Sequence, residues 1–506
     1  MTSNVQRKKI ALWSAVALSA TSMIGSGWLF SAQLAARLAG QWAFAAWMLA
    51  AAQVILVALS ISRVVMAFPV RGAITRSSSL SHNNVFGMPF AFANWFGMMV
   101  TIATEAQATT QYLSAAIKST ALIGPAGLTV QGKLLALGIL FMYLMINFWG
   151  IKLLARINNV VTILKVFTPL FTIAVLLIAH FDHSNFTMIE VNQHYGWNSA
   201  LAAIVGAGLI YSYNGFQLPA AFASEIENPK RNVALAMVIS IVIVMGLYMA
   251  LEYTFMGAVP HQLLVEKGWA GLNFSSPLVN LAMLLGLNFL VILLMADSVV
   301  SPSGTGYSYL GACSRMLYAM AAEGQMPRFI AKLSPKHNFS KRSMLINWIL
   351  AAIVLWNSAN WAALMVVVTG YHIIGYMAAP ISMSAIDGRT KIPGLILFVI
   401  LGLLMTTITP HDLLVMNISL TALVFIYMLI QFKKGSSLAD LLLLAFPFLI
   451  YLWLIYAITP LWVNVVLSLI LFSVVTSKRY VQFCKNDRFV ESQIGMEEQE
   501  SGNSVH

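Results

Sequence analysis

Long apolar runs separated by short polar loops extend along nearly the whole chain. The runs at 160–179 and 233–248, for example, carry one charged residue or none and approach or reach the roughly 20 residues that cross a bilayer as a helix. We therefore predict an all-α polytopic membrane protein with fourteen transmembrane helices. The predicted spans are residues 10–36, 42–68, 90–117, 133–149, 157–180, 199–222, 233–257, 279–312, 343–358, 361–385, 393–409, 412–432, 438–457 and 460–477.

Two of these spans are interrupted by glycine and polar residues, at 21–28 and at 211–216. In hydrocarbon, unpaired backbone groups cost several kcal/mol, so such a break persists only where it lines a cavity enclosed by protein. A kink, or a close helix contact through small residues, is the alternative explanation for either break alone. Because the breaks fall in the first and sixth spans, they favour a five-plus-five inverted repeat with a site at mid-membrane.

The two breaks also indicate a class of ligand. A helix that begins at mid-membrane presents unpaired N–H groups, which suit a carboxylate. A helix that ends there presents carbonyl groups, which suit an ammonium. A molecule that carries both groups, an amino acid, fits such a pair of breaks.

Composition and charge agree with a membrane protein. Of the 506 residues, 59% are hydrophobic and 9% are charged, whereas about 25% of the residues in a soluble domain are charged. The net charge of +12 comes from small basic groups between apolar runs, which excludes a nucleic-acid surface. Most of the 29 Lys and Arg residues fall in alternate loops, and cytoplasmic loops collect such residues. We predict a multi-pass protein of the cytoplasmic (inner) membrane with both termini in the cytoplasm; a twelve-span alternative leaves both termini on the same side.

These patterns predict the domain organisation. Residues 1–9 form a cytoplasmic N-terminus, 10–385 a transport core of spans one to ten, 386–477 four additional spans, and 478–506 a disordered cytoplasmic tail. The apolar run after Arg7, Lys8 and Lys9 is too long for a cleaved signal peptide, so we interpret it as an uncleaved first span. The segment 68–89 is predicted to be an amphipathic cytoplasmic loop, and no disulfide is expected from Cys313 and Cys484.

Three motifs identify a family. The break at 21–28, the second break with the following Ala-Ser-Glu-Ile-Glu-Asn-Pro-Lys-Arg at 223–231, and Cys-Ser-Arg-Met-Leu-Tyr-Ala-Met-Ala-Ala-Glu-Gly-Gln-Met-Pro at 313–327 closely resemble the amino acid, polyamine and organocation (APC) permease superfamily. Two basic residues, Lys230 and Arg231, stand where that family usually has one. The resemblance covers roughly residues 10–432. Asp297 with the polar stretch 301–306 resembles the branch that includes bacterial aspartate:proton symporters.

The resemblance implies alternating access, spans one to five inverted onto six to ten, and an amino acid held between the two breaks. Carboxylate contacts are then expected from Ile24, Gly25, Ser26 and Gly27. The amine and the side chain are expected to meet Tyr213, Asn214, Gly215 and Phe216, with an aromatic ring as a thin gate. Glu225 and Arg231 are expected to hold the inward gate, and a solvated charged loop is the alternative for them.

Ionisable residues inside the spans are candidates for coupling, because such residues are expensive in a membrane. Lys165 lies in the fifth span on one face with Asn158, Thr162 and Pro169. Its ammonium would exchange a proton or replace a sodium ion permanently, as the fifth span of sodium-independent relatives suggests; the alternative is a lysine that reaches the cytoplasmic headgroups.

Three acids also fall within spans. Glu105 shares a face with Thr101 and is predicted to point into the bundle, where it would accept a proton, pair with Lys165 or contact substrate. Asp297 is a second candidate for coupling. Glu252 is predicted to make a structural pairing nearer the outer end, and His372 a packing or hydrogen-bonding role.

We predict a sodium-independent, proton-coupled symporter that imports amino acids, with an acidic or small polar substrate. An amino-acid exchanger, a channel and a non-transporting sensor are the alternatives. An enzyme is not predicted, because the spans contain no His pair with metal spacing and the chain has no Gly-x-Ser-x-Gly or Walker-type loop. No cofactor or metal is expected; the partners are a free amino acid, protons and the lipid bilayer. The sequence leaves the exact amino acid and the oligomeric state open.

Overall fold

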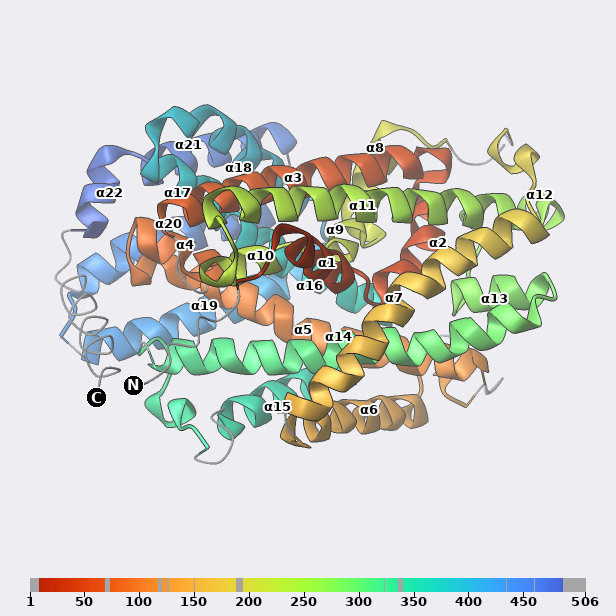
Figure 1. Cartoon of the computed structure of the whole chain (residues 1–506). Coiled ribbons are helices and arrows are strands. Elements are labelled where there is room, and N and C mark those ends of the chain that lie inside the picture. Colours follow the sequence, from red (N-terminus) through yellow and green to blue (C-terminus); the bar gives the residue numbers. More distant parts are fainter. Residues whose placement is uncertain are drawn as a thin grey trace. The chain divides into compact units, whose positions relative to one another are not determined.

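The computed structural model describes residues 9–68, 73–116, 121–124, 127–149, 151–187, 194–322, 324–334, 340–433, 435–458 and 460–485. These residues form a nearly all-helical chain with one short β-hairpin (Figure 1). Residues 1–8 of the predicted terminus (1–9) and residues 486–506 of the predicted tail (478–506) lie outside the described residues.

A helix or a group of helices lies over each predicted span. Over the first five spans the elements are α1 (Leu12–Met23), α2 (Gly27–Ala39), η1 (Gly40–Trp42), α3 (Ala43–Ala67), α4 (Ala73–Ser81), α5 (Asn84–Ala116), β1 (Ile123–Gly124), β2 (Gly127–Leu128), α6 (Val130–Trp149) and α7 (Ile151–Ala179). Strands β1 and β2 pair antiparallel, with Ile123 opposite Leu128.

The elements over spans six to ten follow after η2 (His183–Phe186). They are α8 (Trp197–Gly206), α9 (Leu209–Ser212), α10 (Leu218–Ala221), η3 (Ala223–Glu225), α11 (Pro229–Ala258), α12 (His261–Lys267), α13 (Pro277–Leu284), α14 (Asn288–Ala322), η4 (Arg328–Ala331), α15 (Lys341–Asn357), α16 (Trp361–Tyr376) and α17 (Ala378–Ile386). The last elements are η5 (Gly388–Thr390), α18 (Lys391–Met405), α19 (Pro410–Lys433), α20 (Leu438–Ala457), α21 (Leu461–Val475) and α22 (Lys478–Lys485).

Ten helices among the described residues are long and apolar enough to cross a membrane, or eleven if the bent pair α21 and α22 counts as one span. That tally joins residues 27–67 into one helix, and it leaves out α1, which has 12 residues. The all-α polytopic fold is therefore present, and the number fourteen stays a prediction.

The described residues divide into two compact units. The first takes its residues from 1–58, 95–219 and 225–371, and the second from 59–94, 220–224 and 372–506. In the first unit, α1 packs against α11, α2 against α8, and α14 against α6, α7 and α15. In the second unit, α17 packs against α4 and α18, and α19 packs against α20. The predicted boundary at residues 385 and 386 stays a prediction.

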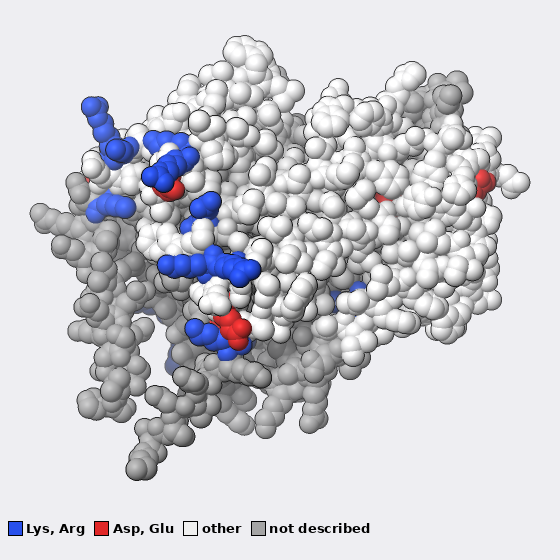
Figure 2. All heavy atoms as spheres, turned by 45° about the horizontal axis from the view of Figure 1, so that its top comes forward, with Lys and Arg blue, Asp and Glu red and all other residues white. Residues whose placement is uncertain are grey.

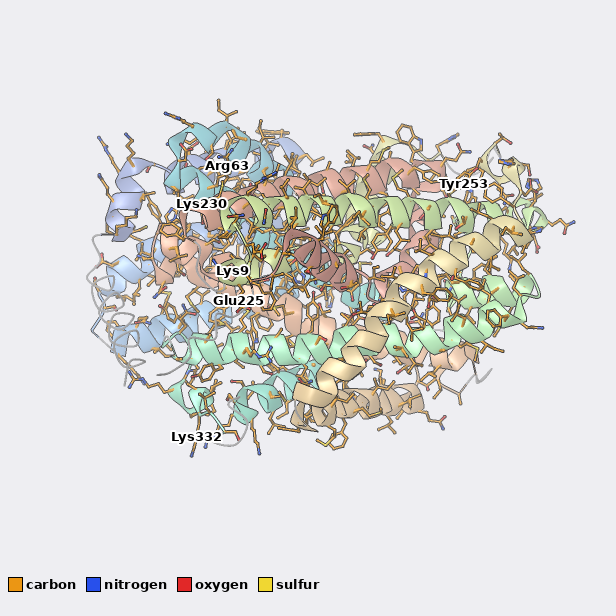
Figure 3. The ribbon with its side chains drawn as sticks, viewed as in Figure 1. Lys9, Arg63, Glu225, Lys230, Tyr253 and Lys332 are labelled. Carbon is orange, nitrogen blue, oxygen red and sulfur yellow. The ribbon has the colours of Figure 1, made fainter. Side chains whose placement is uncertain are left out.

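Charged side chains are unevenly distributed over the surface. Figure 2 shows Lys and Arg gathered in one part of the visible face, while much of that face carries no charged side chain. In the first unit, Lys9, Glu225, Lys230 and Lys332 lie toward one end and Tyr253 toward the other (Figure 3). Basic residues gathered toward one end of a membrane-spanning unit are the pattern that the positive-inside rule describes.

Both predicted breaks are present. Helix α1 leaves helical geometry at Ile24, whose φ is −83° and ψ is 84°, and α2 begins at Gly27. In the sixth span, α9 ends at Ser212 and α10 begins only at Leu218. The turn between α9 and α10 contains Gly215 at φ 112°, a conformation that side chains rarely tolerate.

Two predictions of irregular structure are wrong in their described parts. Within the predicted loop 68–89, residues 73–81 form α4, and α5 starts at Asn84 although it contains Pro89. Asn83 Oδ1 accepts a hydrogen bond from Phe86 N at 2.9 Å, which starts α5 before the proline. The predicted disordered tail begins with helix α22, because Cys484 is buried and its carbonyl accepts a hydrogen bond from Asn83 Nδ2 at 3.2 Å.

His82 joins several elements of the second unit. Its Nε2 donates to the Val475 carbonyl at 2.9 Å, its Nδ1 lies 2.8 Å from Ser81 Oγ, and its ring stacks on Phe86 at 4.3 Å between centroids. Ser81 Oγ in turn donates to Ser382 Oγ at 3.0 Å. Burial lowers the pKa of His82 to about 4, because the charged imidazolium loses its hydration.

Acid is therefore expected to destabilise the second unit through His82. The unfolded imidazole binds a proton near pH 6.5 but the folded one only near its pKa of about 4, so unfolding takes up a proton. The loss begins as pH falls through about 6.5 and reaches at most about 3 kcal/mol near pH 4. The measurement compares apparent melting temperatures in detergent at pH 7.5 and 4.5. On acidification the melting temperature of His82→Gln is expected to fall less than that of the parent protein. The control His411→Gln, which changes an exposed histidine, is expected to fall as much as the parent. An equal fall in all three proteins would contradict the assignment.

Candidate functional site

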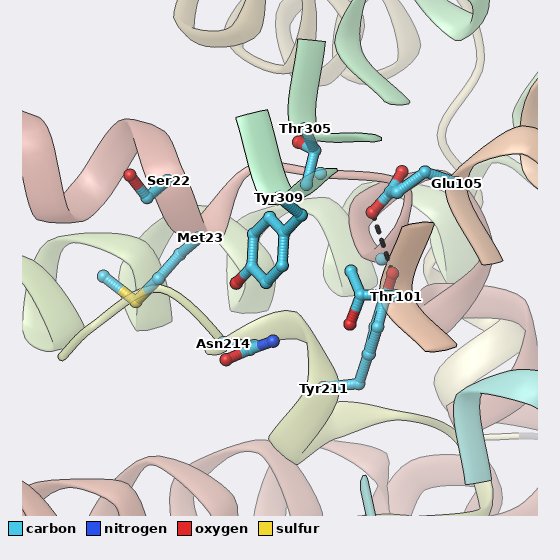
Figure 4. Close-up of a pocket in the computed structure, with 10 residues that line it drawn as sticks. Ser22, Met23, Thr101, Glu105, Tyr211, Asn214, Thr305 and Tyr309 are labelled. Carbon is cyan, nitrogen blue, oxygen red and sulfur yellow. Dashed lines mark hydrogen bonds between the residues drawn. The ribbon is translucent and has the colours of Figure 1, made fainter. Parts of the chain in front are cut away.

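A small cavity of the first unit lies where the two breaks meet (Figure 4). Its volume is about 10 Å³, enough for roughly one water molecule. An amino acid therefore fits only if the lining moves. The lining residues are Ser22, Met23, Gly25, Gly27, Thr101, Glu105, Tyr211, Asn214, Thr305 and Tyr309.

The backbone of the first break is bound by an acid from α5. Ser26 N donates to the Glu105 carboxylate, at 3.1 Å from Oε2 and 3.4 Å from Oε1. Tyr211 Oη donates to Glu105 Oε1 at 2.8 Å (Figure 4). Trp361 Nε1 donates to Ser26 Oγ at 2.9 Å. The N–H group that the break leaves without a helical partner is thus bound to a carboxylate already, and Glu105 as a whole is 1% exposed.

Glycine is required at the break because other groups approach it closely. A Cβ atom on Gly25 would lie 2.9 Å from Glu105 Oε1 and 3.3 Å from Thr305 Oγ1. A Cβ atom on Gly215 would lie 2.7 Å from the backbone carbonyl carbon of Ser22, in addition to the strain of its positive φ. The two breaks are therefore in direct contact.

Tyr248 of α11 ties the carbonyl ends of both breaks together. Its hydroxyl lies within hydrogen-bond distance of Met23 O at 2.8 Å and of Ser212 O at 3.1 Å. A second hydroxyl binds the second break: Ser19 Oγ donates to Phe216 O at 3.1 Å. Carbonyl oxygens of both breaks, which carry partial negative charge, are therefore held by neighbouring hydroxyl groups.

Two polar groups of the second break have no hydrogen-bond partner among the described residues. They are Asn214 Nδ2 and the Tyr213 hydroxyl. Asn214 lines the cavity and is 6% exposed, so its amide is a buried donor directed at the space that a ligand would take. Tyr213 packs instead against the rings of Trp47 and Tyr248.

The predicted coupling residues connect to the cavity through Thr305. Lys165 Nζ donates to Thr305 Oγ1 at 2.7 Å and lies close enough to Glu105 and Asp297 for the charges to interact. Asp297 Oδ1 accepts from Ser301 Oγ at 3.1 Å, one turn before Thr305. The ammonium of Lys165 is thus bound inside the protein and does not reach for a headgroup.

The predicted gate residues lie beside the chain terminus. Ile10 forms a parallel bridge with Ile226; its N donates to Glu225 O at 2.8 Å, and its carbonyl accepts from Glu227 N at 3.0 Å. Arg231 follows in the first turn of α11. The gating role of Glu225 and Arg231 stays a prediction.

The structure brings Gly25, Gly27, Asn214 and Glu105 together at the cavity wall. The other predicted contacts, Ile24, Ser26, Tyr213, Gly215 and Phe216, belong to the same two breaks but do not line it. Sequence reasoning missed Tyr309, Tyr248 and Trp361, because a single aromatic residue in an apolar helix resembles an ordinary core residue. Glu252, predicted to be structural, accepts a hydrogen bond from Trp47 Nε1 at 3.0 Å.

Comparison with known proteins identifies the family. The amino acid permease family matches residues 10–479. A glutamate/serine transporter of Bacillus subtilis (strain 168) is 34% identical over 394 residues, which are 77% of this chain and 73% of the relative. An aspartate-proton symporter of the same organism is 29% identical over 387 residues, 76% of this chain and 74% of the relative. This chain therefore belongs to the amino acid permease family, whose members are transporters and not enzymes.

Proposed function

We propose that the protein imports acidic or small polar amino acids across the cytoplasmic membrane by proton-coupled, sodium-independent symport, with both termini in the cytoplasm. The observation that carries the proposal is the cavity between the two breaks. A backbone N–H of the first break, backbone carbonyls of both breaks and buried ionisable groups all lie at this cavity or beside it.

Each end of an amino acid has a complementary group in this set. The substrate carboxylate binds at the Ser26 N–H, where α2 begins and its partial positive charge is concentrated. The ammonium binds toward the carbonyls of Met23 and Ser212, which lie at the ends of α1 and α9. The assignment follows from the chemistry of the two breaks, since a helix start offers N–H donors and a helix end offers carbonyl acceptors.

The side chain of the substrate is placed beside Asn214. Its unpartnered Nδ2 needs an acceptor, because leaving a buried donor unpaired costs about 1–3 kcal/mol. A hydroxyl or carboxylate oxygen satisfies it and a hydrocarbon side chain does not. The substrates that the names of the two relatives give, glutamate, serine and aspartate, all carry such an oxygen in the side chain.

Proton coupling is assigned to the buried ionisable set of Lys165, Glu105 and Asp297. Lys165 supplies a fixed site of positive charge, so no sodium ion is required there. The carboxylates of Glu105 and Asp297 are the groups that would take up and release the proton. The relative described as an aspartate-proton symporter supports this form of coupling.

Uptake into proteoliposomes tests the proposal. An inward proton gradient is expected to drive accumulation of labelled L-aspartate, L-glutamate or L-serine, and an inward sodium gradient at equal pH is not. If uptake occurs only into proteoliposomes that were preloaded with an amino acid, the protein is an exchanger instead. Accumulation driven by sodium would overturn the assignment of Lys165, and no uptake of any common amino acid would overturn the proposal as a whole.

A further inference from the structure

The carboxylate of Glu105 makes the contacts that an incoming amino acid needs. It accepts from Ser26 N, the backbone donor of the first break, and from the Tyr211 hydroxyl. Because Gly25 has no side chain, the carboxylate reaches the break directly. With the cavity at about 10 Å³, a substrate carboxylate cannot reach Ser26 while Glu105 stays there.

We propose that Glu105 is a tethered substitute for the substrate carboxylate, which holds the empty site closed, and that its protonation releases the site, so that proton and amino acid bind together. The inference rests on the proposed function. The proton comes from the solution on the side from which the amino acid enters: the ionised Glu105 carboxylate takes it up, one O–H bond forms, and the neutral acid leaves the Ser26 N–H.

Charge balance explains why binding of the amino acid requires protonation of Glu105. In the closed site the negative Glu105 faces the positive Lys165, and no other cation among the described residues is assigned a charge interaction with Glu105. A second carboxylate beside it would repel the first and would share its single cation, which is costly in a buried site. If Glu105 is neutral, the substrate carboxylate takes over both the N–H and the positive charge of Lys165, and the number of ionised carboxylates that face this ammonium is unchanged.

The surroundings of Glu105 contain other groups that titrate, and they must be considered with it. Asp297 faces Lys165 and competes for its charge. Several tyrosines contact Glu105 or lie close enough to interact with its charge, and their hydroxyls stay neutral over the pH range of the test. They are Tyr211, Tyr143, Tyr248 and Tyr309.

The test is equilibrium binding of L-serine to the full-length protein in detergent at pH 5.5 and 8.5. Serine is the probe because its side chain does not titrate. The parent protein is expected to bind it at least about tenfold more weakly at pH 8.5, where the tether is ionised and in place. Glu105→Gln and Glu105→Ala are expected to bind equally at both values, and roughly 10- to 100-fold more tightly than the parent at pH 8.5, because a hydrogen bond to a charged group contributes about 1.5–3 kcal/mol.

The matched control is Glu252→Gln, which changes a second buried acid of the first unit outside the cavity and is expected to keep the parent's pH dependence. Weaker binding by both Glu105 variants would show that Glu105 contacts the substrate ammonium, and this outcome would overturn the inference. An unchanged pH dependence in the variants would also overturn it, while leaving the proposed function in place. If the parent binds none of L-serine, L-glutamate and L-aspartate at either pH, the proposed function and this inference fail together. Should the alanine variant fail to fold, the near-isosteric glutamine variant decides.

Discussion

Lys165→Ala is expected to abolish concentrative amino-acid uptake while the protein still folds. The substituted chain loses the ammonium that binds Thr305 and faces Glu105 and Asp297. In the resting protein, the two acids then become neutral by taking up protons, so no uncompensated charge remains. A substrate carboxylate, in contrast, would enter without a cation, and an unpaired buried charge costs about 3–5 kcal/mol, so substrate affinity should fall roughly 100-fold or more.

The measurement is proton-driven uptake into proteoliposomes, with the apparent melting temperature as the check on folding. Lys267→Ala removes an exposed lysine of α12 and serves as the matched control, with uptake expected at the parent level. Lys165→Arg keeps the positive charge but does not release a proton near neutral pH. Retained symport in the arginine variant would therefore identify a fixed charge. Unchanged pH-dependent uptake in Lys165→Ala would reject the coupling role of this residue.

Gly25→Val is expected to weaken substrate binding by roughly 10- to 100-fold. Its Cβ would lie 2.9 Å from Glu105 Oε1 and 3.3 Å from Thr305 Oγ1, and its two methyl groups would enter a cavity of about 10 Å³. Overpacking of this kind costs about 1–3 kcal/mol even where neighbours relax, which corresponds to roughly a 10- to 100-fold loss of affinity. The readout is stabilisation against heat by L-serine or L-aspartate, because a bound ligand raises the apparent melting temperature.

Gly138→Val is the control for this substitution. Gly138 lies in α6, and a Cβ atom there would meet nothing within 4 Å. Both positions lie in or beside helices of the first unit, so the pair separates loss of the site from a general effect of valine on helix formation. Normal affinity in Gly25→Val would place the substrate elsewhere in the protein.

The helical architecture and the two breaks could be predicted from the sequence because each depends on local composition. An apolar run long enough to cross a bilayer has few alternatives to a helix, and glycine with polar residues inside such a run identifies a break. The sequence also predicted that Glu105 points into the bundle interior, because it shares a polar helix face with Thr101. Its partner could not be predicted, because Ser26 lies 79 residues away in sequence and the contact depends on packing in three dimensions.

Aromatic residues of the site were beyond sequence reasoning for a different reason. Trp361 begins α16 and binds Ser26 Oγ through its indole N–H, but nothing local separates it from the other 12 tryptophans of the chain. The same holds for the hydroxyl of Tyr248. Helices α4 and α22 were missed because both are short and polar on average, so neither resembles a membrane span. Tertiary hydrogen bonds at His82 and Asn83 order the residues beside them.

Tyr248 has one hydroxyl hydrogen, and the carbonyls of Met23 and Ser212 both lie within its reach. Any rearrangement that draws the broken end of α1 away from that of α9 must leave at least one of these carbonyls without this donor. The two breaks are thus coupled through the Tyr248 hydroxyl and behave as a single hinge. Bending one helix half without the other costs the free energy of a hydrogen bond. A pair of spectroscopic probes placed on α1 and α9 would accordingly report one concerted transition rather than two separate steps.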